Sequence, residues 1–244
     1  MLARLARLLG ALERPGVWRA ALSWPKFSLA SFLIVSRLKQ HGVAPATVVD
    51  VGANVGQFAV ASAKLFRGVT VISVEPDPQI AKQLKENVKR LPVDVVVVAL
   101  GEQTGQAAFH VNRDSQVSSL LPLGSDRECD FPDSKVIGRI TVNVETLDTL
   151  FSDRILKAPI LLKLDVQGFE EQVLRGGGAF LQRIQWVVVE VAFGNLYEGE
   201  ADFASILKLL EDKGLIFTRP VNWFTSPRTG EVIEMDALFT RSIQ

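Results

Sequence analysis

Cysteine and histidine are scarce in this 244-residue sequence, which has one cysteine, Cys129, and two histidines, His41 and His110. One cysteine cannot form an internal disulfide, and it excludes zinc sites that are built from several cysteines. Two histidines far apart in the sequence leave no H-E-x-x-H helix and no histidine cluster for a metal. Hydrophobic residues make up 48% of the chain and charged residues 22%, which argues against intrinsic disorder.

The sequence also lacks a long hydrophobic run. The longest one, Phe27 to Val35, has nine residues, and two of them are serines, whereas a transmembrane helix needs ~20 apolar residues. Residues 1–12 are rich in Leu and Arg and lack the uncharged stretch and cleavage site of a signal peptide. We therefore expect a cytoplasmic protein whose basic N-terminal segment packs on the domain or contacts a membrane surface peripherally.

The net charge of the chain is zero, but its basic and acidic residues are unevenly distributed along the sequence. Residues 1–47 contain seven Lys and Arg residues and one acid, which leaves 20 of the 27 basic and 26 of the 27 acidic residues to the rest of the chain. A basic leading segment either packs on the acidic body or is attracted to an anionic surface. The acidic body argues against nucleic-acid binding, for which a basic face is typical. We predict a basic helical segment over 1–44 and one domain over 45–244.

Strand and helix patterns alternate from residue 47 onward. Short runs rich in Val, Ile and Leu predict buried strands, and segments with helical spacing lie between them. The expected strands are 47–51, 69–74, 93–100, 160–166 and 185–191, with final strands at 215–220 and 235–241. The expected helices are 55–66, 77–90, 146–152, 169–182 and 200–213, and 101–145 forms a β-rich insertion. The pattern predicts an α/β fold with a doubly wound, mostly parallel sheet.

Carboxylates stand at or near the ends of four predicted strands: Asp50, Glu75, Asp165 and Glu190. A carboxylate directly after an apolar strand is costly to bury unless it is paired or faces a cleft. Parallel strands end at one edge of the sheet, where ligands bind in such folds. The sequence therefore predicts one polar cleft at this edge.

The first turn, Asp50-Val51-Gly52-Ala53-Asn54-Val55-Gly56, differs from the G-x-G-x-x-G turn of dinucleotide-binding folds. Asn54 stands where the second glycine would make room for a pyrophosphate. The turn instead favours a nucleoside with an amino-acid tail and no phosphate. Glu75 follows the next strand, where a carboxylate can accept hydrogen bonds from both ribose hydroxyls.

Four segments together carry a resemblance to a known family: VVDVGANVGQFA, VISVEPDP, VVALGEQTG and LLKLDVQGFEEQVLRGG. They resemble the FkbM-type S-adenosylmethionine-dependent methyltransferases over residues 45–240, and ITVNVETLDTL and the Ser-Ser-Leu at 118–120 also match. The resemblance implies a Rossmann-like sheet with a reversed last strand. It also implies O-methylation of a hydroxyl on a sugar, glycan or polyketide-like acceptor, with S-adenosylhomocysteine as the second product.

The resemblance also implies which residues hold the cofactor. The amino-acid end of S-adenosylmethionine is expected at Asp50, Gly52, Asn54 and Gly56, and its ribose at Glu75. Three further residues are expected around the adenine: Pro76 and Leu100 beside the ring, and Glu102 at its amino group.

A hydroxyl that receives a methyl group must lose its proton, and a carboxylate is a suitable acceptor. Asp165 is the expected base, and Lys163 lies two residues earlier on the same face of a strand, where it can neutralise an acid in the cleft. Glu190 and Glu170 are further candidates, although Glu170 also suits the first turn of a helix. Asp165 and Glu190 could chelate a divalent cation, but the sequence does not require a metal and we predict none.

Two alternatives remain open from the sequence. One is an NAD-dependent oxidoreductase, against which Asn54 argues, and the other is a non-catalytic nucleoside-binding or partner-binding module with the same fold. Loops 102–140 and 192–200 are the expected acceptor-binding segments, and they contain Arg113, Arg127, Arg139, Asn195 and Tyr197. The pattern identifies neither the acceptor nor the oligomeric state.

Overall fold

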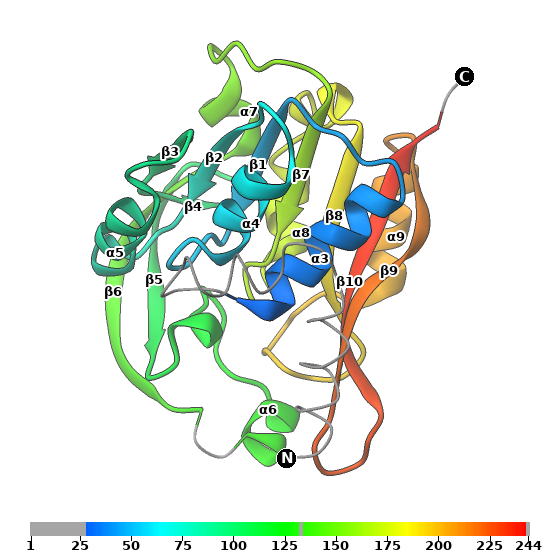
Figure 1. Ribbon diagram of the computed structural model, residues 1–244. Helices are drawn as coiled ribbons and strands as arrows, with labels where there is room; N and C mark the ends of the chain where they lie inside the picture. The colour runs from blue at the N-terminus through cyan, green and yellow to red at the C-terminus, as the bar shows by residue number, and fades with distance from the viewer. Residues whose placement is uncertain (1–27, 132–133, 243–244) are drawn as a thin grey trace.

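A seven-stranded sheet forms the centre of the computed structural model, which describes residues 28–131 and 134–242 (Figure 1). Its strands in spatial order are β3 (Val93–Val96), β2 (Thr70–Val74), β1 (Thr47–Val51), β7 (Ile160–Leu164), β8 (Trp186–Ala192), β10 (Val232–Arg241) and β9 (Leu215–Thr225). The first five are parallel, and β10 is antiparallel to both of its neighbours. The predicted doubly wound sheet with a reversed last strand is confirmed.

Helices cover both faces of this sheet because neighbouring strand residues point to opposite sides. On one face, Val48 of β1 packs with α3 (Leu29–Gln40) and α4 (Gln57–Leu65). On the other, Val49 packs with α7 (Leu147–Phe151), α8 (Glu170–Arg175), the 3₁₀ turn η2 (Phe180–Arg183) and α9 (Phe203–Glu211). All five residues of β1 and of β7 are buried, as expected for central strands with continuous apolar runs.

Helix α5 (Pro78–Val88) begins where its sequence predicts. The side chain of Asp77 accepts a hydrogen bond from the backbone N–H of Gln79 at 2.7 Å, and Pro78 occupies the first helical position. This cap fixes the chain directly after Glu75, so it also fixes the strand end that carries that carboxylate.

The β-rich insertion forms a second, three-stranded sheet with the order β4 (Ala99–Leu100), β6 (Val136–Glu145) and β5 (Gly105–Asn112). It also carries the 3₁₀ turn η1 (Ser115–Val117) and the short helix α6 (Ser125–Asp130). The expected single strand 93–100 is wrong in one respect. The chain leaves the large sheet after Val96 and enters the small one at Ala99, which the uninterrupted apolar run does not reveal.

The expected helix 169–182 is also wrong in its extent, because α8 ends at Arg175 and η2 begins at Phe180. Three glycines, Gly176 to Gly178, separate the two. A Cβ on Gly176 would lie 2.1 Å from the carbonyl oxygen of Gly101, so the chain leaves the helix where it passes close to the insertion.

Helix α3 belongs to the same hydrophobic core as the sheet. Its buried residues Ile34, Val35 and Leu38 pack in one cluster with β1, β7 and β8, and Arg37 donates a hydrogen bond to the carbonyl oxygen of Val221 on β9. The expected division after residue 44 stays a prediction, and the basic residues 1–27 lie outside the described residues. Within the described ranges, every helix is too short or too polar to traverse a lipid bilayer.

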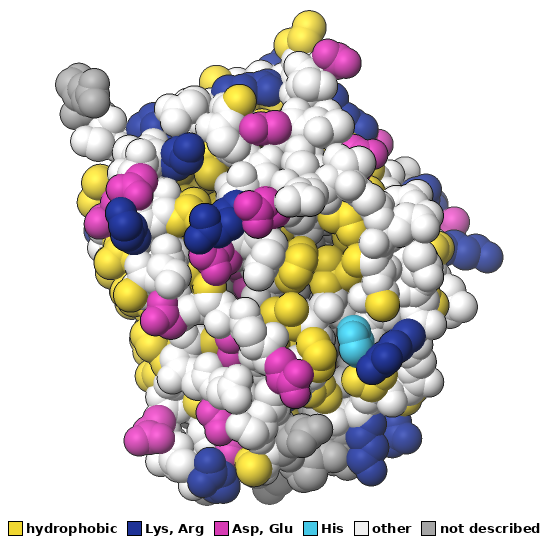
Figure 2. Space-filling view, turned by 180° about the vertical axis from the view of Figure 1, so that it is seen from behind, with side chains coloured by type: hydrophobic (Ala, Val, Ile, Leu, Met, Phe, Trp, Pro, Cys, Tyr) yellow, Lys and Arg dark blue, Asp and Glu magenta, His cyan; other side chains and the backbone are white. Residues whose placement is uncertain are grey.

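Charges of both signs are interspersed on the face opposite to that of Figure 1, with hydrophobic side chains between them (Figure 2). Among the described residues on this face, neither sign predominates over a continuous area. On this side of the molecule, the described residues therefore form no extended surface of one charge sign.

Replacing Leu38 with Ala is expected to lower the free energy of unfolding by about 2–5 kcal/mol, because a fully buried leucine is lost from a packed cluster. Gln40→Ala, an exposed position at the end of the same helix, is the control and should change it by less than about 0.5 kcal/mol. Chemical denaturation measures both. Equal effects of the two substitutions would show that α3 is not part of the core.

Candidate active site

A cavity of about 570 Å³ opens at the carboxyl ends of β1, β2, β7 and β8. The insertion, α6 and the ends of β9 and β10 supply its other walls, and Ser31 and Ile34 of α3 and its N-cap Ser28 also line it. The cavity therefore lies at the edge of the sheet where the sequence predicts a polar cleft. Of the predicted site residues, eight line it: Gly52, Asn54, Glu75, Pro76, Leu100, Lys163, Asp165 and Glu190.

A buried ion-pair chain lies at the floor of this cavity. Lys163 and Asp50 are register partners on β7 and β1, and the Lys163 Nζ lies 3.6 Å from Asp50 Oδ1 and 3.0 Å from Asp165 Oδ2. Asp50 has no exposed surface, and burial raises its pKa although Lys163 opposes this effect. Burial alone would lower the pKa of Lys163, but the Asp165 and Asp50 carboxylates raise it above its usual range. Lys163 therefore stays charged.

Asp165 is the most exposed member of this ion-pair chain, with 32% of its side chain accessible in the cavity. Burial acts to raise its pKa, but the Lys163 ammonium and the Gln167 amide hold the pKa below its usual value. Asp165 is therefore an ionised carboxylate at neutral pH.

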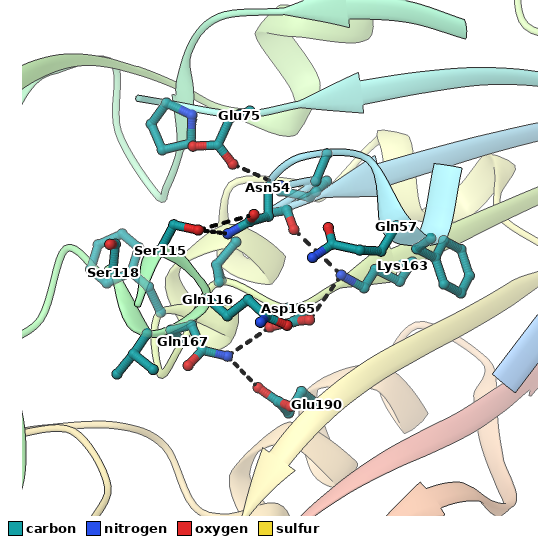
Figure 3. A pocket seen from close by; sticks show the side chains of 18 of the residues that line it. Asn54, Gln57, Glu75, Ser115, Gln116, Ser118, Lys163, Asp165, Gln167 and Glu190 are labelled. Atoms are coloured by element: carbon teal, nitrogen blue, oxygen red, sulfur yellow. Dashed lines mark hydrogen bonds and ion pairs between the residues drawn. The ribbon is translucent and has the colours of Figure 1, made fainter. Parts of the chain in front are cut away.

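Gln167 joins Asp165 to Glu190 (Figure 3). Its Nε2 donates to Asp165 Oδ1 and to Glu190 Oε2, both at 2.7 Å, and its Oε1 accepts a hydrogen bond from the Tyr197 hydroxyl. The backbone of Gln167 is left-handed, with φ +58°, an uncommon conformation for a residue with a side chain. Burial and then the charge of Asp165 raise the pKa of Glu190 well above its usual value, so Glu190 holds a proton more readily than an ordinary glutamate.

The first turn brings its backbone close to β7. Gly52 has φ +76°, and a Cβ at this position would lie 1.8 Å from the carbonyl oxygen of Asp165. Only glycine allows the two strand ends to approach in this way. Asn54 is also left-handed, with φ +48°, and its side chain exchanges hydrogen bonds with the Ser115 hydroxyl at 3.1 and 3.2 Å. The turn is thereby connected to the insertion across the cavity (Figure 3).

Glu75 is anchored by two backbone N–H groups. Its Oε2 accepts from Asn54 at 2.8 Å and its Oε1 from Asp77 at 3.0 Å. The residue is buried, and burial raises its pKa to about 7. Each carboxylate oxygen retains a second lone pair, so Glu75 can accept further hydrogen bonds from a ligand in the cavity.

Four predicted site residues do not line the cavity. Asp50 lies beneath it, and Glu102 is exposed outside it. Gly56 begins α4 with φ +95°, and a Cβ there would lie 2.5 Å from Leu84, so its glycine serves packing. Glu170 is buried, accepts a hydrogen bond from the Val166 N–H at 2.7 Å, and has a pKa raised to about 8 by burial.

Several lining residues were not expected from the sequence. Gln167 stands inside a quoted motif, but a neutral amide gives no sign of the two carboxylates that it joins. Asn222, Glu234 and Asp236 come from β9 and β10. Their place at the cavity follows from the antiparallel pairing of β10 with β8, which no local pattern encodes.

The model of the methyltransferase FkbM domain matches residues 50–217. The chain belongs to this family. The match covers more than half of the sequence and confirms the resemblance of its motifs, and it favours a methyltransferase over the oxidoreductase alternative.

Two curated relatives are similar over most of this chain. The 2-O-methyltransferase NoeI of Sinorhizobium fredii is 29% identical over 180 residues, which are 71% of this chain and 74% of NoeI. The hexuronic acid methyltransferase AglP of Haloferax volcanii is 28% identical over 169 residues, or 68% of this chain and 62% of AglP. A solved structure of a proposed RNA methyltransferase from Pyrococcus horikoshii shares the fold. Its TM-score is 0.53 at 14% identity, over 95% of this chain and 99% of that protein.

Replacing Gly52 with Ala is expected to cost more than about 3 kcal/mol of stability or to prevent folding, because the added Cβ collides with a backbone oxygen. Gly68→Ala is the matched control: its φ is +67°, and nothing lies within 4 Å of an added Cβ. This control should cost only the conformational strain, about 1–2 kcal/mol. Thermal and chemical denaturation measure both variants, and equal losses would contradict the close approach at Gly52.

Proposed function

We propose that this protein is an S-adenosylmethionine-dependent O-methyltransferase whose acceptor is a hydroxyl of a sugar, a glycan or a related small molecule. The observation that carries the proposal is an ionised carboxylate, Asp165, in the same cavity as the buried carboxylate of Glu75. Membership of the FkbM family supports methyl transfer. The names of the relatives NoeI and AglP support a hydroxyl and a sugar as the acceptor.

The residues of the cavity suit the proposed cofactor. Glu75 offers free lone pairs to the two hydroxyls of a ribose, and Pro76 and Leu100 line the same side as apolar neighbours for an adenine. Gly52 and Asn54 form the turn at which the amino-acid end would lie. When bound, S-adenosylmethionine supplies a methyl group on a positively charged sulfur and leaves as S-adenosylhomocysteine.

The protein's own part in the transfer is alignment and removal of a proton. Asp165 accepts the proton of the acceptor hydroxyl, and Lys163 keeps Asp165 ionised until the acceptor arrives. Gln167 fixes the direction of the Asp165 carboxylate, because the Gln167 Nε2 donates a hydrogen bond to Asp165 Oδ1. Alignment of two reactants in one site is worth about 7–11 kcal/mol of the barrier in favourable cases. Metal dependence and a peripheral membrane contact through residues 1–44 are not part of this proposal.

We expect binding of S-adenosylmethionine to weaken as pH falls through about 7, the pKa to which burial raises Glu75. Above this pH the carboxylate accepts hydrogen bonds from both ribose hydroxyls; below it, the added proton removes part of that capacity. At pH 6 the affinity contributed by Glu75 should fall roughly tenfold. Titration calorimetry between pH 6 and 8 measures the effect. Glu75→Gln is the control, because it should bind more weakly at pH 8 and lack this part of the pH dependence. An unchanged pH profile in Glu75→Gln would remove Glu75 from the cofactor site.

Asp165→Asn should lower the rate of methyl transfer by roughly 10²–10⁴-fold, because the shape is kept and the proton acceptor is lost. Cofactor affinity should stay within a few-fold of the wild-type value. Asp94→Asn is the matched control, since Asp94 is also ion-paired, with Arg154 at 2.9 Å, and lies outside the cavity. Rate, cofactor affinity and melting temperature are measured on both. A normal rate with a lower melting temperature in Asp165→Asn would reduce Asp165 to a structural partner of Lys163.

A further inference from the structure

The cavity extends to both sides of the β1–β7 pair. Glu75 and Pro76 lie on the side of β2, and Glu190, Asp236 and Asn222 lie on the side of β8, β10 and β9. If Glu75 holds the ribose, the acceptor hydroxyl must reach Asp165 from the opposite side. This second half of the cavity, formed by β8, β10, β9 and α6, is called the β8–β9 half below.

A row of polar side chains crosses three adjacent strands in the β8–β9 half. Glu190 on β8 is the register partner of Asp236 on β10, and Asp236 is the register partner of Asn222 on β9. The Asn222 Nδ2 donates to Asp236 Oδ2 at 3.0 Å. Asp236 retains lone pairs in the cavity, so the row offers hydrogen-bond acceptors to a ligand above it.

Arg127 of α6 adds a donor to the same half. Its Nη1 lies 3.3 Å from Glu234 Oε1 on β10, and the residue is only 8% exposed. Its Nε is buried and has no hydrogen-bond partner among the described residues. Arg127 therefore balances the charge of Glu234, while its Nε is shielded from the cavity.

Two aromatic rings complete the wall. Phe131, directly after α6, and Phe224 of β9 both line the cavity, and their ring centroids lie 5.8 Å apart. The guanidinium of Arg127 lies 5.1 Å from the centre of the Phe131 ring. Apolar rings beside a few polar groups suit a ligand that has both C–H surfaces and hydroxyls.

Among the described residues, carboxyl groups outnumber cations in this half, and burial opposes their ionisation. Four lining carboxylates surround the two lining cations, Lys163 and Arg127; they are Asp165, Glu190, Glu234 and Asp236. Burial, opposed by Arg127 and assisted by Asp165, raises the pKa of Glu234 to about 7. Burial and then Asp165 raise the pKa of Asp236 to about 6. A further carboxylate placed here would meet both desolvation and repulsion.

We infer that the β8–β9 half binds an uncharged, polyhydroxyl acceptor, a neutral sugar, and discriminates against the same sugar bearing a carboxylate. Hydroxyls donate hydrogen bonds without adding charge, so they suit the acceptors of the carboxylate row. Glu234 and Asp236 are the specificity-determining residues in this inference, which rests on the proposed function. A preference for a neutral sugar would distinguish this chain from its relative AglP, whose name specifies a hexuronic acid.

The test is a competition between matched p-nitrophenyl glycosides. Glucose is paired with glucuronic acid and galactose with galacturonic acid, and methylated products are quantified by mass spectrometry with S-adenosylmethionine present. The hexose should be methylated at least about tenfold faster than its hexuronic acid, because one like charge is avoided. Glu234→Gln and Asp236→Asn should each narrow this ratio several-fold. Glu231→Gln removes the same charge from an exposed position outside the cavity and should leave the ratio unchanged.

Equal or faster methylation of the hexuronic acids would overturn the inference while leaving the proposed function in place. A ratio that both cavity variants leave unchanged would also overturn it, because the selectivity would then come from elsewhere. Methylation of no glycoside, with S-adenosylmethionine still bound in calorimetry, would overturn the proposed sugar acceptor and this inference with it.

Discussion

The buried ammonium of Lys163 is the interaction on which the site depends. It lies between Asp50 of β1 and Asp165 after β7, and the ring of Phe58 is 5.7 Å away on α4. A charge in this position requires partners, because an unpaired buried charge is among the most costly features of a folded protein. The two carboxylates depend on Lys163 in turn. Asp50 tolerates complete burial only beside Lys163, and Asp165 retains its charge in the cavity for the same reason. The same two ion pairs of Lys163 therefore stabilise both the pairing of the central strands β1 and β7 and the floor of the cavity.

Much of this arrangement could be predicted from the sequence. Buried parallel strands are nearly uniform apolar runs, so Lys163 and Asp50 inside such runs stand out. Parallel strands also end at a common edge, which places Asp165, Glu190 and Glu75 together without further information. The β-branched run at 93–100 shows the limit of this reasoning, because its composition does not say which sheet each half joins.

The remaining parts of the site could not be predicted, for physical reasons that differ from residue to residue. Asp236 and Asn222 reach the cavity through antiparallel pairing, so their distance along the chain from Glu190 carries no signal. Arg127 is in an expected acceptor-binding loop, but its position at the cavity depends on the placement of α6, which rests on contacts such as that of Asp126 with the Asn195 N–H at 2.8 Å. Gln167 is uncharged, so nothing in the sequence marks it as the residue whose amide connects the carboxyl groups of Asp165 and Glu190. Conversely, Gly56 and Glu170 belong to recognisable motifs but serve packing and the backbone of the loop.

The reversal of β10 has a consequence for how the acceptor side can change. Four of the parallel strands, β1, β2, β7 and β8, meet the cavity at their carboxyl ends, so altering that side disturbs the loops that lead into α4, α5 and α8. Strand β10 instead begins at this edge, and β9 ends there, so the two are joined by a short turn at residues 226–231 beyond the cavity. Lengthening or reshaping this hairpin would alter the depth of the β8–β9 half while the parallel strands and their charges stay as they are. The topology therefore separates the part of the protein that can diverge between substrates from the part that must stay constant for methyl transfer.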